Sequence, residues 1–144
     1  MTKEKIAIGN DHAGFGLKTE VLELLKEKGY EYEDFGSYDT NSVDYPVIAK
    51  KVSDAVVSKS FDLGILICGT GIGMDICANK IKGIRASLCT DTFSAHSARE
   101  HNDANVLCLG ARVTGPELAK EIINVWLNAK FKGGRHQRRV EMFE

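Results

Sequence analysis

The chain lacks long apolar segments, a marked excess of charge of either sign and any closely spaced pair of cysteines. Nothing in its 144 residues approaches the length of an apolar helix that could span a membrane. A formal net charge of -1 gives no general attraction to nucleic acid or to anionic membrane surfaces. We therefore expect neither nucleic acid nor a membrane among its partners.

The four cysteines, Cys68, Cys77, Cys89 and Cys108, form no CxxC pair. A disulfide framework would be unusual in a chain of this size and class, so we expect reduced thiols. The spacing offers no cluster of ligands for zinc, and we predict no metal site. The N-terminal residues lead directly into a strand-like segment without an apolar secretory segment, which favours a cytoplasmic protein.

The composition is that of one ordinary globular domain, with 43% hydrophobic and 27% charged residues. Strand-like segments at 6–9, 30–35, 63–68, 85–89 and 105–109 alternate with helix-like segments at 17–28, 44–56, 72–79, 91–101 and 114–126. Such alternation is typical of parallel βαβ units. We predict an α/β fold over residues 1–144: a single Rossmann-like three-layer αβα sandwich, with five helices around a five-stranded parallel sheet. Thr114 and Glu117 have the spacing of a capping box for the last helix.

The most informative segment is the one in which the apolar run 63–67 ends in Cys68 and then in alternate glycines, Gly69, Gly71 and Gly73. In open α/β sheets, ligands bind outside the carboxyl ends of the strands, and glycines let backbone N–H groups approach an anion. A thiolate is favoured beside a helix N-terminus. Cys68 is therefore predicted to act as a base or a nucleophile, and the alternative is a small buried core residue.

Two glycine-containing loops, at residues 14–19 and 69–74, each lack the third glycine of the dinucleotide-binding fingerprint. A pair of glycines alone marks an ordinary turn. We expect neither loop to hold a nicotinamide cofactor.

Polar residues follow other expected strands and helices. Asp11 and His12 follow the first strand, His101 ends the fourth helix and Arg112 follows the fifth strand. A histidine titrates near neutrality and can move protons on a polyhydroxyl ligand. Taken singly, these residues also fit an Asx-turn and a histidine that complements a helix dipole.

Residues 131–144 form a C-terminal arm in which Arg135 and Arg139 are four residues apart. A helix here would present both guanidinium groups on one face, and their forked donors suit phosphate oxygens. The alternative is a solvated, charged terminus. Together, the residues predict a phosphate-bearing small molecule, a thiol base and a histidine acid.

In combination these motifs point to one protein family. The chain resembles, nearly end to end, the sugar-phosphate isomerase family that contains the B-type ribose-5-phosphate isomerases and the galactose-6-phosphate isomerase subunits. The resemblance is carried by residues 9–14, 44–46, 67–73, 100–102 and 133–137. It implies an aldose–ketose isomerisation that interconverts ribose 5-phosphate and ribulose 5-phosphate through a cis-enediolate, without metal or other cofactor.

The resemblance also implies the roles of individual residues. Cys68 matches the base that removes the carbon-bound proton, Thr70 the hydroxyl that moves a proton between the substrate oxygens, and His101 the acid that opens the furanose ring. The implied substrate contacts lie in the glycine loop, at the strand ends and in the arm: Asp11, His12, Gly69, Gly71, Ile72, Gly73, Asn102, Arg112, Arg135 and Arg139. Some relatives use a carboxylate further along the glycine loop as the base, and Asp75 lies near that place.

Members of the family are dimers or dimers of dimers with sites at subunit interfaces. The resemblance therefore implies that His101, Asn102 and Arg112 serve the Cys68 of a second copy. Two alternative functions stay open. One is the isomerisation of a hexose 6-phosphate of the allose or galactose type, the latter in a hetero-oligomer. The other is a non-catalytic sugar-phosphate-binding protein, which would have no use for Cys68.

Overall fold

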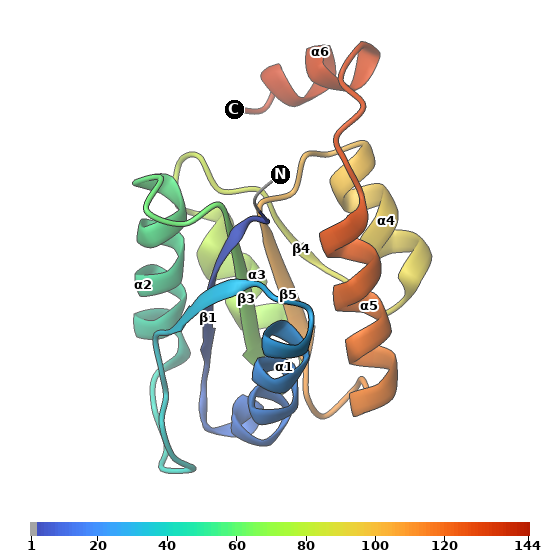
Figure 1. Ribbon diagram of the computed structural model, residues 1–144. Helices are drawn as coiled ribbons and strands as arrows, with labels where there is room; N and C mark the ends of the chain where they lie inside the picture. Colours follow the sequence, from blue (N-terminus) through green and yellow to red (C-terminus); the bar gives the residue numbers. More distant parts are fainter. Residues whose placement is uncertain (1–2) are drawn as a thin grey trace.

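The computed structural model describes residues 3–144, and its centre is a five-stranded sheet. The strands are β1 (Lys5–Asn10), β2 (Glu31–Asp34), β3 (Leu63–Cys68), β4 (Ala86–Leu88) and β5 (Val106–Gly110). Neighbouring strands run parallel in the order β2-β1-β3-β5-β4 (Figure 1). Every residue of β3 and β5 is buried, as expected for central strands covered on both faces.

Helices cover both faces of the sheet. On one face lie α1 (Phe15–Glu27), α4 (Thr92–Glu100) and α5 (Pro116–Asn128), and on the other lie α2 (Tyr45–Val57) and α3 (Ile72–Asn79). A 3-10 turn, η1 (His12–Gly14), precedes α1, and α6 (Arg135–Glu141) ends the chain beyond the sheet (Figure 1). The predicted three-layer αβα sandwich is confirmed.

Each face has its own apolar core because alternate strand residues point to opposite faces. The larger cluster joins Ile8, Ile65 and Leu107 to Val21 of α1 and Trp126 of α5. The smaller cluster joins strand residues to α2 and α3 and includes Ala7, Val52, Leu66, Met74, Cys108 and Cys68. Cys68 therefore lies where the apolar core of the α2/α3 face reaches the edge of the sheet.

The sheet order creates a switch point between β1 and β3. From β1 the chain passes outward to β2, and it then crosses back to β3 on the other side of β1. The register pairs Asn10 with Ile67, and Cys68 with Gly110, so the carboxyl ends of β1, β3 and β5 lie at one edge. Ligands of open α/β sheets bind at this place.

Two details of the sequence prediction are wrong. The described chain contains six α-helices instead of five, because the arm folds into α6. The N-cap of α5 is Gly115, without a side-chain cap bond, so Thr114 and Glu117 form no capping box. Pro116 takes the first helical position, where its missing N–H costs nothing, and this moves the helix start one residue beyond the expected one.

No helix within residues 3–144 combines the length and the apolar character needed to cross a membrane.

Candidate active site

Cys68 is the last residue of β3 and is 5% exposed. Its Sγ accepts a hydrogen bond from the backbone N–H of Gly71, at an N···S distance of 3.1 Å. Gly71 is the N-cap of α3 and has a φ of 81°, in the left-handed region that favours glycine. A side chain there would also come within 2.5 Å of Leu88. The glycine thus permits the turn that directs an N–H donor at the sulfur.

The first turn of α3 supplies the other backbone donors of the loop. The N–H of Ile72 donates to Thr70 Oγ1 at 3.3 Å, so two of the expected anion donors, Gly71 and Ile72, already have acceptors. The N–H of Gly73 belongs to the first helical turn, where the helix itself provides no acceptor. The N–H of Gly73 is therefore available to meet a developing negative charge.

Asp11 lies beside Cys68, at the end of the neighbouring strand. Its Oδ1 accepts hydrogen bonds from Ala13 N–H at 2.9 Å and from Gly14 N–H at 3.2 Å, which caps η1 and fixes the carboxylate. His12 follows, and its Nδ1 accepts the N–H of Val43 at 3.3 Å. In the neutral ring that bond leaves the proton on Nε2. The expected Asx-type turn and a fixed carboxylate therefore occur together.

These residues open onto a pocket of about 420 Å³ at the carboxyl edge of the sheet. Its lining includes Asp11, Cys68, Gly69, Thr70, Ile72, Gly73 and Arg112, together with Tyr45 and Ile76. His12 is not among the lining residues. Arg112 belongs to the same chain's pocket, because its backbone N–H donates to Gly69 O at 2.9 Å and its guanidinium covers Gly69. The expectation that Arg112 serves the Cys68 of a second copy is therefore wrong for this geometry.

Other ionisable groups near the loop lie outside the pocket. Burial raises the pKa of the Cys89 and Cys108 thiols, so both stay protonated at neutral pH. Asp75 is directed towards β4, and its Oδ1 is buried without a hydrogen-bond partner among the described residues. Burial also raises the pKa of Asp75, against a lowering effect of the Leu88 N–H. The structure does not bring Asp75 to the pocket as an alternative base.

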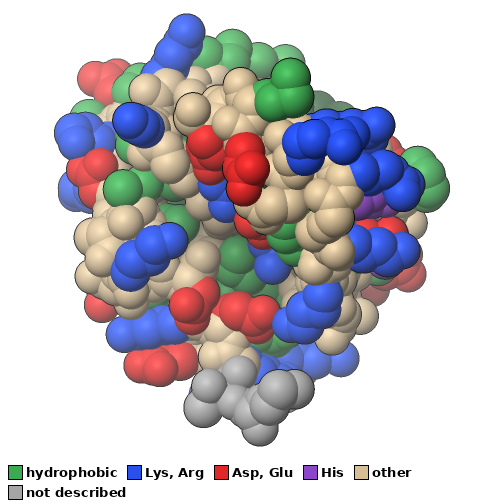
Figure 2. Space-filling model, turned by 90° about the horizontal axis from the view of Figure 1, so that it is seen from above, with side chains coloured by type: hydrophobic (Ala, Val, Ile, Leu, Met, Phe, Trp, Pro, Cys, Tyr) green, Lys and Arg blue, Asp and Glu red, His purple; other side chains and the backbone are tan. Residues whose placement is uncertain are grey.

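A second group of expected site residues lies around α6. The ring of His101 stacks on that of His136 at a centroid distance of 4.4 Å, and His101 Nε2 is 3.3 Å from Glu100 Oε1. Arg135 and Arg139 are exposed on α6, four residues apart as expected. Figure 2 looks onto this end of the molecule and shows Lys and Arg side chains gathered on the side where α6 lies.

The two groups lie at opposite edges of the sheet. Since α4 starts at the carboxyl edge and runs back, its end at Glu100 returns to the amino edge, where β5 begins. Figure 1 shows α6 beyond that amino edge, away from the end of β3. Strands of five or six residues separate the two edges by roughly 17 Å. Within one chain, His101, Asn102, Arg135 and Arg139 do not meet Cys68.

The model of the family described as Ribose/Galactose Isomerase matches residues 6–143 of this chain. The chain belongs to this family. Ribose/Galactose Isomerase members are enzymes, and the fold agrees with this membership.

Individual members of the Ribose/Galactose Isomerase family are similar in sequence to this chain over nearly its whole length. Ribose-5-phosphate isomerase B of Escherichia coli is 52% identical over 138 residues, which cover 96% of this chain and 93% of that protein. D-erythrulose-4-phosphate isomerase of Pectobacterium atrosepticum is 50% identical over 138 residues, which cover 94% of this chain and 90% of that protein. The structure of Clostridium thermocellum ribose-5-phosphate isomerase B has a TM-score of 0.95 at 54% identity, covering 96% of this chain and 93% of that one.

Some residues of this Ribose/Galactose Isomerase site were missed by the sequence analysis. Tyr45 and Ile76 line the pocket, although Tyr45 was expected only as part of a helix start and of the segment 44–46 that carries the resemblance. A side chain at Gly73 would come within 2.5 Å of the Tyr45 ring, a close contact that local sequence does not reveal. The residues 3–144 contain no group of three His, Cys, Asp or Glu side chains placed to hold a metal ion.

Proposed function

We propose that the chain interconverts ribose 5-phosphate and ribulose 5-phosphate, with Cys68 as the base. The observation that carries this proposal is the Cys68 thiol, which faces the switch-point pocket and accepts the N–H of Gly71. The relatives named ribose-5-phosphate isomerase B support the choice of substrate. A non-catalytic binding protein would not need a sulfur held in this way.

In the proposed reaction, the thiolate of Cys68 takes the proton from C2 of the open-chain aldose. The C2–H electron pair forms the C1–C2 double bond of a cis-enediolate, and negative charge develops on O1. The Gly73 N–H is available to stabilise that charge, an effect worth roughly 3–4 kcal/mol per donor in other anion holes. Thr70 moves a proton from O2 to O1, and Cys68 returns its proton to C1, which gives the ketose.

A second copy of the chain completes the site in this proposal. The expected ring-opening acid His101 and the expected phosphate ligands Arg135 and Arg139 lie at the opposite edge of their own sheet. Ile72 and Ile76 flank the pocket and are 52% and 54% exposed, which suits a surface that another subunit covers. We infer a homodimer, alone or within a dimer of dimers, in which the His101 and arm of one subunit face the Cys68 of the other.

The direct test compares Cys68→Ala with the wild type in ribose 5-phosphate turnover. We expect kcat to fall by about 10³-fold or more, because the only proposed base is removed. Cys77→Ser is the matched control, since Cys77 is a partly exposed thiol outside the pocket lining. Wild type and control should be inactivated by a thiol-alkylating reagent, and activity should survive dialysis against EDTA. Equal rates for wild type and Cys68→Ala would refute the mechanism.

One observation favours a second candidate substrate. A relative of 50% identity is named D-erythrulose-4-phosphate isomerase, so tetrose phosphates belong in the same assay. Allose 6-phosphate and galactose 6-phosphate represent the hexose alternatives. One carbon more or less changes transition-state binding by about 1–3 kcal/mol, so the rank of kcat/KM across the set identifies the substrate. The ribose proposal fails if a tetrose or hexose phosphate has the highest kcat/KM.

A further inference from the structure

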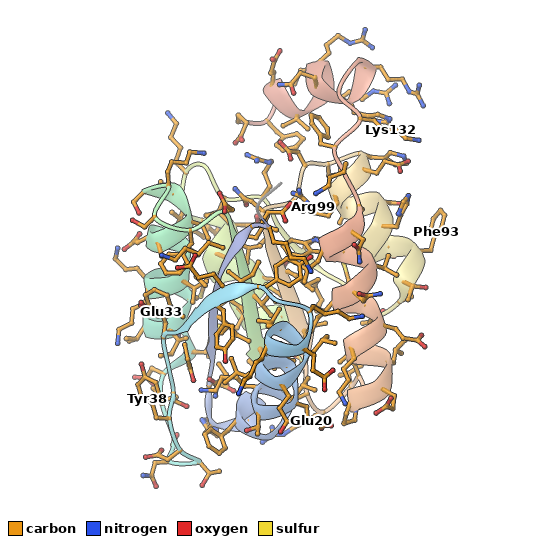
Figure 3. The ribbon with its side chains drawn as sticks, in the orientation of Figure 1. Glu20, Glu33, Tyr38, Phe93, Arg99 and Lys132 are labelled. Atoms are coloured by element: carbon orange, nitrogen blue, oxygen red, sulfur yellow. The ribbon has the colours of Figure 1, made fainter. Side chains whose placement is uncertain are left out.

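Glu100 is the last residue of α4 and lies where the C-terminal arm meets the body of the molecule. Its side chain is 15% exposed. Figure 3 shows Lys132 beside this end of α4, on the segment that leads from α5 to α6. Glu100 takes no part in the proposed proton transfers at Cys68 and Thr70.

The arm is attached to Glu100 by two bonds from the same residue. Lys132 Nζ lies 2.8 Å from Glu100 Oε1, and the Lys132 backbone N–H donates to Glu100 O at 3.1 Å. Lys132 holds the pKa of Glu100 below its ordinary value, and His96 contributes to the same lowering. The carboxylate is therefore charged at neutral pH and binds the segment that positions α6.

The same carboxylate group contacts two histidines. Its Oε1 lies 3.3 Å from His101 Nε2, and its Oε2 lies 2.6 Å from His96 Nε2. In an imidazolium both ring nitrogens carry protons, so a contact at Nε2 leaves the Nδ1 proton of His101 for a substrate oxygen. Glu100 thus touches both the arm and the expected ring-opening acid.

The ring of His136, on α6, covers one face of His101. Arg135 and Arg139 flank His136 on the same helix. Burial lowers the pKa of His136, and His101, Arg135 and Arg139 lower it further. His101 therefore lies between the ring of His136 on α6 and the carboxylate of Glu100, which also binds Lys132.

We propose that Glu100 is a positioning residue that holds His101 and the arginine-bearing arm as one unit. This inference rests on the proposed function, in which that unit enters the site of a second copy. The carboxylate, 3.3 Å from His101 Nε2, orients the ring so that its other nitrogen can face the furanose ring oxygen of the substrate. Through Lys132 it fixes the arm that carries the two guanidinium groups. Ring opening and phosphate binding therefore depend on one side chain.

The test compares Glu100→Gln, Lys132→Met and the double variant, with Glu121→Gln of the exposed surface of α5 as the matched control. Substrates are ribose 5-phosphate and D-erythrose 4-phosphate, whose phosphorylated O4 prevents closure of a furanose ring. We expect both single variants to raise KM for both sugars, because the arm is loosened. Only Glu100→Gln should also lower kcat for ribose 5-phosphate, by about tenfold or more, with a smaller effect on the tetrose.

The double variant should raise KM no further than Glu100→Gln alone, because the two residues act through one contact. If D-erythrose 4-phosphate is not turned over, the split between kcat and KM for ribose 5-phosphate gives the same test. Glu100→Gln should lower kcat and raise KM, whereas Lys132→Met should raise KM alone. An unchanged substrate ratio, or an unchanged kcat for ribose 5-phosphate, in Glu100→Gln would overturn the role in proton donation.

A measurement without substrate separates this inference from the proposed function. Amide hydrogen exchange of residues 130–142 should quicken in Glu100→Gln and Lys132→Met and stay unchanged in Glu121→Gln. If exchange is faster in Glu100→Gln but the wild-type chain does not isomerise ribose 5-phosphate, the role of Glu100 in holding the arm stands and the proposed function is refuted. If exchange is unchanged and the chain is active, only the role of Glu100 in holding the arm is refuted.

Discussion

At the scale of single residues, the contrast between Cys68 and Asp75 leads to a prediction. Asp75 is buried beside β4, one of its oxygens has no hydrogen-bond partner among the described residues, and burial raises its pKa. Its ionised form therefore destabilises the fold at neutral pH. Asp75→Asn should raise Tm by a few degrees at pH 7, the size expected for about 1 kcal/mol, and leave kcat almost unchanged. Thermal unfolding and the ribose 5-phosphate assay check both.

The gain in Tm on replacing Asp75 by Asn should shrink as pH falls. A carboxyl with a raised pKa in the folded state loses its unfavourable charge as pH falls through that pKa, so the advantage of Asn should vanish near the ordinary value of about 3.9. A large loss of kcat in Asp75→Asn would restore this residue as the base. Asp75 was a candidate for that role because it lies just after the glycine loop in the sequence. Its side chain points towards β4 instead, because the packing of α3 on the sheet decides which way each of its side chains points.

At the scale of elements, the loop after β2 is fixed by Lys18 of α1. The Lys18 side chain is 3% exposed, its Nζ lies 2.9 Å from Asp34 Oδ2, and it also donates to Ser37 O. Further along, the Val43 N–H binds His12. Removing the lysine leaves Asp34 without its counter-ion, so Lys18→Met should lower the free energy of unfolding by about 2–3 kcal/mol. Urea denaturation measures this change.

The matched control is Lys50→Met, which breaks an exposed pair with Asp54 and should cost less than about 0.5 kcal/mol. Equal losses in the two variants would contradict a structural role for Lys18. Sequence periodicity predicted the five strands and the helix 72–79 but could not predict this buried pair, because lysine normally signals an exposed position. The start of α5 was also predicted one residue too early, because Pro116 takes the first helical position despite the capping-box spacing of Thr114 and Glu117.

At the scale of the whole molecule, the expected site residues divide into two groups at opposite edges of the sheet. Strand ends and a repeated arginine are local signals that indicated most members of both groups, whereas Thr70 and Asn102 were expected only from the family resemblance. The family resemblance implied that His101 serves a second copy, but it did not show that Arg112 joins the pocket of its own chain, because that depends on the turn after β5, which brings Arg112 onto Gly69. This separation is the strongest argument for a site shared between two copies.

A mixing experiment tests the shared site. In a homodimer with the proposed arrangement, Cys68→Ala removes the base from both sites, and the double variant Arg135→Ala with Arg139→Ala removes the phosphate ligands from both. A mixed dimer carries both defects in one site and none in the other. After refolding an equimolar mixture, half of the dimers are mixed and each has one intact site, so about a quarter of wild-type activity should return. Each variant alone, refolded identically, is the control. If Cys68 and the arginines acted within one chain, both sites of the mixed dimer would be defective and no activity would return.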